Sequence, residues 1–223
     1  MLLALDTSTR MVGIALYDGT QVLCETLWTS QNYHTVELAP AIADMLAKCD
    51  VPAEQLSSVA VALGPGSFTG LRIGLSLAKG LVYVHHIPII GVPSLDILAA
   101  AQPPRDEPMA AMLRAGRGRL AVGTYKWEKK NWKSLAPPEV MTAAELSQQI
   151  QSPTLICGEL TGDEQRLLRR KRKNVILASP AHSIRRPSFL AEIAWRRLQN
   201  GAVDDPASLA PIYLHYNTPI PEP

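Results

Sequence analysis

The chain of 223 residues lacks the features of a secreted or membrane protein. No apolar run approaches the roughly 20 residues that a membrane-spanning helix needs, and no basic segment followed by an apolar one opens the sequence. Cysteine is scarce, and Cys24, Cys49 and Cys157 are widely scattered. An odd, scattered set fits reduced thiols better than disulfides or a metal cluster. We therefore expect a cytoplasmic protein with no membrane contact.

The sequence also has few groups that bind metal ions. His85 and His86 are adjacent and would diverge at the end of a helix, whereas His34, His182 and His215 lie far apart, and there is no HExxH motif. This spacing is atypical of a metal site. We predict no metal site, and a metallopeptidase has no support from these residues.

Charge is low and nearly balanced, with a formal net charge of +2, but it is unevenly distributed. One short segment concentrates basic residues: Arg166, Arg169, Arg170, Lys171, Arg172 and Lys173. Such a segment can contact nucleic-acid phosphates, each contact adding to a salt-dependent affinity, or it can be a solvated helix face. Arg169, Arg170 and Arg172 are the candidate contacts.

Strand and helix patterns alternate along the first half of the chain. Alternating apolar residues predict a three-stranded meander over residues 1–28, and apolar residues three and four apart predict a helix over 34–49. Further strands are expected at 59–63 and 87–92, each followed by a helix. The resulting order is βββαβαβα.

A proline-rich, charged segment at 102–108 separates this half from a second one. Hairpin strands are expected at 109–113 and 120–127, followed by a helix that a capping box begins at Thr142. Shorter elements are predicted at 154–157, 163–173, 175–177 and 188–200. We predict an α/β protein of two lobes, 1–104 and 105–223, in which the second copy of a duplicated βββαβα plan is reduced.

Glycines join the predicted strand at 59–63 to its helix in the sequence Gly-Pro-Gly-Ser-Phe-Thr-Gly, which begins at Gly64. Gly64 and Gly66 permit a sharp turn on either side of Pro65, and Ser67 can cap the helix. The exposed amides of the first helical turn would form an anion site. The same glycines would serve equally where another backbone has to come close, so both interpretations stay open.

Asp6, at the end of the first strand, is a second candidate for nucleotide binding. It can hold a magnesium-bound water beside a phosphate, with the amides of the next residues around that phosphate, or it can form an Asx turn that shapes the hairpin. The candidate residues for a nucleotide or phosphate are Asp6, Thr7, Ser8, Gly64, Gly66 and Ser67.

Small residues recur every four positions along the helix after Ser67 and flatten one of its faces. Glycine inside a helix costs roughly 1 kcal/mol relative to alanine, so a compensating contact is expected. Because the helix is apolar nearly all round, we expect a partner protein to cover it together with the helix at 34–49. The predicted partner interface comprises His34, Leu38, Ile42, Gly70, Leu71, Gly74, Leu75 and Ala78.

Several motifs together resemble those of the TsaB (YeaZ) family, densely over residues 1–104 and sparsely beyond. They are Asp6-Thr-Ser-Thr, Gly64-Pro-Gly-Ser-Phe-Thr-Gly-Leu-Arg-Ile-Gly, Ala78-Lys-Gly-Leu, Ile87-Pro-Ile-Ile-Gly-Val-Pro-Ser and Leu209-Ala-Pro-Ile-Tyr. The resemblance implies a two-lobed actin-like fold of the ASKHA, ribonuclease H-like group.

The resemblance also implies a function. TsaB is the non-catalytic partner of the TsaD subunit, which with TsaE adds threonylcarbamoyl to the adenosine next to the anticodon of tRNAs that read ANN codons. It implies a helix-pair interface with TsaD and a homodimer when TsaD is missing. No cofactor is expected to be required by this chain, although ATP or ADP at the complex interface stays open.

One departure from TsaD concerns its metal. Where TsaD carries two histidines four residues apart, this chain has Ser94 and Leu98. Serine is a poor ligand and leucine is none, so the resemblance implies no catalytic metal here. The alternative functions are a small sugar-kinase-like phosphotransferase and, as the less favoured one, a metallopeptidase.

Overall fold

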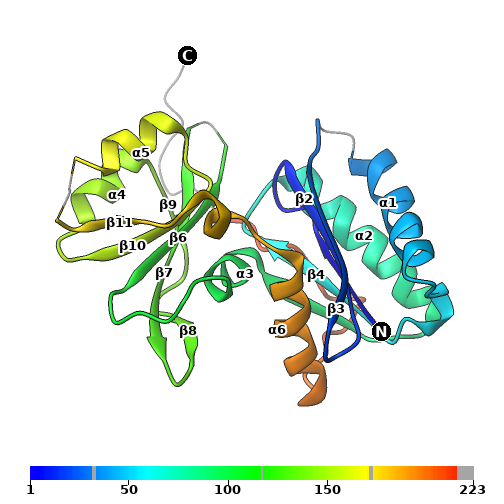
Figure 1. The fold of residues 1–223 in the computed structure, drawn as a ribbon. Helices are drawn as coiled ribbons and strands as arrows, with labels where there is room; N and C mark the ends of the chain where they lie inside the picture. Colours follow the sequence, from blue (N-terminus) through cyan, green and yellow to red (C-terminus); the bar gives the residue numbers. More distant parts are fainter. Residues whose placement is uncertain (32–33, 117, 171–172, 215–223) are drawn as a thin grey trace.

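Two β-sheets form the framework of the protein, one in each lobe (Figure 1). The computed structural model describes residues 1–31, 34–116, 118–170 and 173–214, and of His34 only the backbone. The first sheet has the order β3-β2-β1-β4-β5. Its strands are β1 (Leu2–Asp6), β2 (Met11–Tyr17), β3 (Val22–Thr29), β4 (Ser58–Gly64) and β5 (Ile89–Pro93).

The second sheet repeats this arrangement with the order β11-β10-β6-β7-β8, and β9 also pairs with β7. Its strands are β6 (Met109–Arg114), β7 (Leu120–Glu128), β8 (Asn131–Ser134), β9 (Glu139–Met141), β10 (Thr154–Gly158) and β11 (Val175–Leu177). In both sheets the first strand is antiparallel to the second and parallel to the strand that follows the first helix. The expected α/β fold with a duplicated plan is confirmed. The expected reduction of the second copy does not extend to its sheet, which has six strands against five in the first.

Helices cover both faces of each sheet. They are α1 (His34–Lys48), α2 (Phe68–His85), α3 (Ser94–Ala100), α4 (Ala143–Gln149), α5 (Gly162–Leu168) and α6 (Pro187–Gln199), with short 3₁₀ helices at Ala53–Gln55 and Pro180–Ser183. The predicted capping box is formed, because Thr142 accepts a hydrogen bond from the Glu145 amide and Glu145 accepts one from the Thr142 amide. None of the helices among the described residues combines the length and apolar character needed to cross a membrane.

Strand β1 is buried on both faces because its side chains alternate between two cores. Leu3 and Leu5 pack with α1 and α2, whereas Leu2 and Ala4 pack with α6. The face toward α6 is rich in small residues, including Ala15, Ala60 and Ala62. Small side chains allow a helix to lie close to a sheet, and Leu190, Ala191 and Ala194 of α6 fill that space.

The two lobes exchange their last helices. α3 ends the first half, but Leu95, Leu98 and Ala99 belong to the core of the second sheet. α6 ends the second half, but it packs on β1 and β2 of the first sheet, as Figure 1 shows. The boundary expected between residues 104 and 105 therefore separates the strands of the two sheets. It does not hold for α6, which the expected division assigns to the second lobe but which packs on the first sheet.

The glycine stripe of α2 lies inside the first lobe. Gly70, Gly74 and Ala78 are buried, and a Cβ atom added at Gly70 would overlap the backbone oxygen of Thr7. A Cβ atom at Gly74 would overlap the Thr7 hydroxyl. The compensating contact for these glycines is therefore the turn after β1, and our expectation that the stripe forms a partner-facing surface is wrong.

Two glycine-to-alanine changes in α2 test this packing. Gly70→Ala should lower the free energy of unfolding by roughly 1–3 kcal/mol, because the added methyl group meets backbone that cannot rotate away. Gly80→Ala is the matched control, since nothing lies within 4 Å of its added Cβ. It should raise the free energy of unfolding by about 1 kcal/mol. Urea denaturation measures both, and equal stabilities for the two variants would contradict this packing.

Candidate functional site

The end of β1 and the turn after it carry three polar side chains, Asp6, Thr7 and Ser8, and all three are buried. The Ser8 amide donates to Asp6 Oδ1 at 2.8 Å, which is the Asx turn considered from the sequence. Thr7 Oγ1 donates to the Gly70 carbonyl oxygen at 2.7 Å. The hydroxyl oxygens of Ser8 and Ser94 lie 2.5 Å apart. Each of these candidate phosphate-binding groups is thus occupied by a contact within the protein.

The glycine loop before α2 lies directly against this turn. The Gly64 amide donates to Ser94 Oγ at 3.0 Å, and the Ser67 amide donates to the Ser8 carbonyl oxygen at 2.6 Å. A Cβ atom at Gly66 would overlap that same carbonyl. Ser67 also caps α2 as predicted, accepting from the Gly70 amide. Of the two interpretations left open by the sequence, the structure therefore supports close approach of two backbones.

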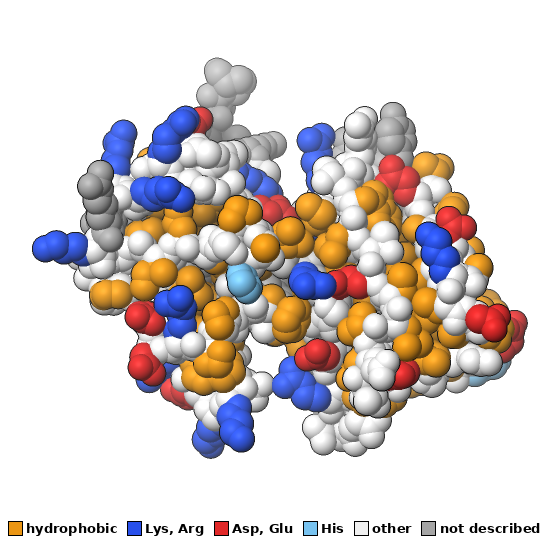
Figure 2. All heavy atoms as spheres, viewed as in Figure 1, with side chains coloured by type: hydrophobic (Ala, Val, Ile, Leu, Met, Phe, Trp, Pro, Cys, Tyr) orange, Lys and Arg blue, Asp and Glu red, His pale blue; other side chains and the backbone are white. Residues whose placement is uncertain are grey.

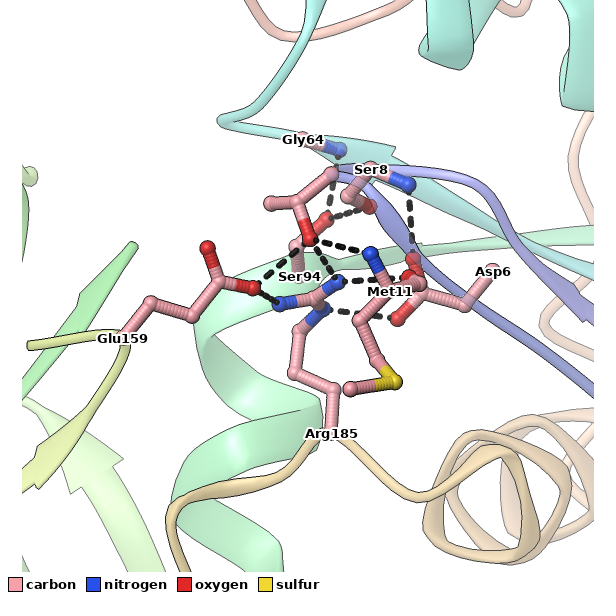
Figure 3. A network of polar contacts seen from close by, with 8 residues as sticks. Asp6, Ser8, Met11, Gly64, Ser94, Glu159 and Arg185 are labelled. Atoms are coloured by element: carbon pink, nitrogen blue, oxygen red, sulfur yellow. Dashed lines mark hydrogen bonds and ion pairs between the residues drawn. The ribbon is translucent and has the colours of Figure 1, made fainter. Parts of the chain in front are cut away.

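Arg185 is at the centre of the contacts between the lobes, and only 2% of it is exposed. Figure 3 shows its guanidinium group between Asp6, at the end of β1, and Glu159, directly after β10. Arg185 Nε donates to Asp6 Oδ2 at 2.8 Å, and Nη1 donates to Glu159 Oε1 at 2.6 Å. Nη2 donates to Thr9 Oγ1 at 2.8 Å and to the Met11 carbonyl oxygen at 3.2 Å.

The electrostatics of this group follow from its partners. Burial alone would lower the pKa of the Arg185 guanidinium, but the carboxylates of Asp6 and Glu159 more than offset that effect. The pKa of Arg185 therefore lies above its ordinary value. The Thr9 hydroxyl donates to Glu159 Oε1 at 2.6 Å and so joins the same network. A buried cation is stable here because two carboxylates and two neutral oxygens surround it.

A magnesium nucleotide bound in the way considered for Asp6 would lie at this inter-lobe position and would need the Asp6 carboxylate and the neighbouring amides to be free. In this chain, one carboxylate oxygen of Asp6 accepts from an amide and the other from Arg185. The amides of Gly64 and Ser67 already donate to Ser94 and Ser8. These residues, in this arrangement, do not fit a magnesium nucleotide.

Ser94, which stands where the resemblance implies a metal-binding histidine of TsaD, also lies in this region. Ser94 is the hydroxyl that joins Ser8 to Gly64, and Leu98 is fully buried in the core around α3. Among the described residues, no three His, Cys, Asp or Glu side chains gather as metal ligands would. Ser94 therefore connects two backbone turns.

A separate feature lies on the outer side of the helix pair α1 and α2. Five predicted interface residues are core residues, namely Leu38, Ile42, Leu71, Leu75 and Ala78, each at most 6% exposed. The side chain of His34 lies outside the described residues. A surface hollow of about 460 Å³ runs between the helices, and its lining is Thr35, Leu38, Ala39, Arg72, Ile73, Ser76 and Leu77. The residues of α1 and α2 that a partner can reach therefore lie, apart from Leu38, one or two positions along the sequence from the predicted interface residues.

Basic side chains gather on the second lobe. Figure 2 shows several Lys and Arg side chains over the part of this lobe where α5 lies. A hollow of about 590 Å³ there has a lining of Arg166, Arg169, Arg170, Val175 and Leu177. The helix is shorter than the sequence predicts, since α5 ends at Leu168, and the candidate Arg172 lies outside the described residues.

Arg114, from the hairpin of the second lobe, is not part of this hollow. Its guanidinium forms a two-pronged ion pair with Glu164 of α5. Burial would raise the pKa of the Glu164 carboxyl, but the Arg114 contact and the hydrogen bonds from Thr161 hold that pKa below its ordinary value. Arg114 thus connects β6 to α5.

Sequence reasoning does not identify Glu159 or the role of Arg185. In the sequence Arg185 is one of several basic residues, and it binds an aspartate 179 positions away. No local pattern marks it, because its burial depends on how α6 returns to the first lobe. The one local signal for Arg185 is its position two residues before the helix that Pro187 begins.

Comparisons with known proteins agree with this architecture. The family model described as TsaD, tRNA N6-adenosine threonylcarbamoyltransferase, matches residues 25–200. A Bacillus subtilis protein named tRNA threonylcarbamoyladenosine biosynthesis protein TsaB is 34% identical over 75% of this chain and 74% of its own length.

Solved structures give the same result for the fold. YeaZ from Pseudomonas aeruginosa matches with a TM-score of 0.80 and 24% identity over 96% of this chain and 99% of that one. An activator of 2-hydroxyisocaproyl-CoA dehydratase from Clostridium difficile, solved with bound ADPNP, has a TM-score of 0.54 and 11% identity, with 90% and 96% covered. The fold is therefore the actin-like one that was expected. From the family model and the B. subtilis relative together, the chain belongs to the TsaB (YeaZ) family of tRNA threonylcarbamoyladenosine biosynthesis proteins.

Proposed function

We propose that this chain is a non-catalytic partner subunit that binds TsaD, and with it TsaE, in the complex that adds threonylcarbamoyl to the adenosine next to the anticodon of tRNA. The observation that carries the proposal is the contrast between two places in the first lobe. The inter-lobe position, where the sequence suggested a nucleotide, is filled by Arg185 and its partners. The hollow between α1 and α2, by contrast, is open at the surface.

The helix pair is suited to a protein partner. The exposed sides of Ile73, Leu77 and Ala39 give the hollow an apolar lining, and Arg72 lies at its edge with its guanidinium 3.7 Å from the centre of the Phe68 ring. Phe68 itself is 54% exposed. An apolar centre beside an arginine and an exposed aromatic ring is the composition that protein interfaces favour. We expect TsaD to bind here, and a second copy of this chain to bind here when TsaD is missing.

The contribution of such a subunit is conformational. A partner that binds one arrangement of TsaD more tightly than others shifts the population toward that arrangement without taking part in chemistry. ATP or ADP at the interface of the complex is compatible with this role, because a nucleotide held there would not need the inter-lobe position of this chain.

The basic hollow of the second lobe is the proposed contact with tRNA. Among the described residues, neither Arg169 nor Arg170 has an acidic partner, although Arg166 pairs with Asp163. Two arginines without acidic partners beside a hollow can each bind a phosphate oxygen with charge-assisted hydrogen bonds. The hollow lies on the second lobe and the helix pair on the first, so both surfaces can be occupied together (Figure 1).

A charge placed in the hollow between α1 and α2 tests the interface. Ala39→Arg, or Ser76→Arg, should abolish co-purification with TsaD and reduce tRNA modification by the reconstituted complex, because the added cation has to be buried among apolar groups. Both positions are exposed in the isolated chain, so the fold should be unaffected. Ala144→Arg adds the same side chain at an exposed position of α4 and should leave binding unchanged. Unaltered binding of TsaD by both hollow variants would contradict the proposed interface.

Replacements in the buried part of the same helices would not be informative. Leu75 belongs to the core around β1 and β4, and Gly74 packs on Thr7. From the sequence, Leu75→Arg or a bulky residue at Gly74 is expected to abolish the complex with TsaD while leaving the monomer folded. The burial of both residues makes that expectation wrong, since each change would disturb folding itself.

Reversing two charges tests the tRNA contact. With Arg169→Glu and Arg170→Glu, the slope of the logarithm of tRNA affinity against the logarithm of salt concentration should become shallower by about 1 for each phosphate that the complex no longer binds. The measurement uses the assembled complex. The matched control, Arg105→Glu with Lys133→Glu, makes the same charge change at exposed positions away from the hollow. If the variant with Arg169→Glu and Arg170→Glu still binds TsaD and its salt slope is unchanged, the tRNA contact is refuted while the TsaD interface is not.

A further inference from the structure

The network around Arg185 joins residues that are distant in sequence and belong to different lobes. Asp6 ends β1 of the first sheet and Glu159 directly follows β10 of the second, whereas Arg185 lies on the segment by which the chain crosses from one lobe to the other. Figure 3 shows the guanidinium lying between the two carboxylates. The inter-lobe position is thus a cation site, and the cation is the Arg185 side chain of the chain itself.

The neighbouring contacts show how closely this segment is held. Arg186 forms an ion pair with Glu25 of β3, and the Ser188 amide donates to Glu25 Oε1 at 2.9 Å. Partial burial would raise the pKa of the Glu25 carboxyl, but the hydrogen bonds from Arg186 and Ser188 and the Arg186 charge together hold that pKa below its ordinary value. Arg185 therefore faces the interior between the lobes, while Arg186 faces the surface of the first sheet.

We propose that Arg185 is a built-in cation that fills the inter-lobe site in place of a magnesium nucleotide and fixes the two lobes in one arrangement. The three guanidinium nitrogens of Arg185 donate four hydrogen bonds, and the acceptors belong to Asp6, Glu159, Thr9 and Met11. Among the side chains, only the planar guanidinium group of arginine offers donors in this arrangement. The acceptors around Arg185 therefore suit a guanidinium group, and a free planar organic cation is the class of ligand that could replace this side chain. This inference does not depend on the proposed partner role.

Chemical rescue tests the proposal. Arg185→Ala removes the cation and leaves Asp6 buried opposite Glu159, so its melting temperature should fall by on the order of 10 °C. Guanidinium chloride at low millimolar concentration, far below denaturing levels, should raise that temperature again in a saturable way. Sodium chloride at the same ionic strength should not. A melting temperature equal to that of the unmodified chain, or the absence of saturable rescue, would overturn the proposal.

The adjacent arginine supplies a matched control. Arg186→Ala removes an ion pair whose arginine side chain is 53% exposed, so its melting temperature should change by no more than about 2 °C. Guanidinium should give no saturable increase for this variant. An equal rescue of both variants would show a general effect of the ion and would refute a specific guanidinium site.

Two further measurements decide the question if Arg185→Ala does not fold. Arg185→Lys keeps the charge but cannot make the four bonds at once, so it should also melt at a lower temperature than the unmodified chain. Magnesium ATP titrated calorimetrically into the unmodified chain should give no binding heat. Micromolar binding of magnesium ATP to that chain, or a lysine variant as stable as the parent, would refute the inference.

Discussion

The lobes depend on each other because each half of the chain gives its last helix to the other sheet. α3 buries one face of the second sheet through Leu95 and Leu98, and α6 buries one face of the first through Leu190 and Ala194. A sheet must cover both of its apolar faces to be stable in water. Neither half can therefore complete its own core, and the two lobes form one folding unit although they share no strand.

The exchange of helices explains why a charged group lies in the interior. To reach the first sheet, the chain has to cross from the second lobe, and Arg185 is on that crossing. A buried guanidinium is strongly unfavourable without counter-charges. One of its carboxylates belongs to each lobe, so the electrostatic requirement is met only when the lobes adopt this arrangement. Packing of α6 and pairing of Arg185 thus favour the same geometry.

Much of this architecture could be predicted from local patterns. The meander, the helix α1, the cap at Ser67 and the capping box at Thr142 follow from periodicity and turn chemistry, which act over a few residues. The side of α2 that faces the sheet could not be predicted, because the helix is apolar nearly all round and its periodicity marks no single buried face. The pairing of Asp6 with Arg185 was beyond sequence reasoning for a different reason. It joins residues 179 positions apart through the path of the chain.

The turn after β1 and the glycine loop show how a motif suited to phosphates can serve packing instead. Backbone amides near a helix start are available to a ligand only when nothing else accepts from them. Here the Ser67 amide meets the Ser8 carbonyl, and the Gly64 amide meets Ser94. These contacts hold the end of β4 and the start of α2 against the turn after β1 and the start of α3. Contacts that attach the start of α2 to the rest of the lobe reduce the ordering that is needed when a partner covers this helix, so less entropy is lost on binding.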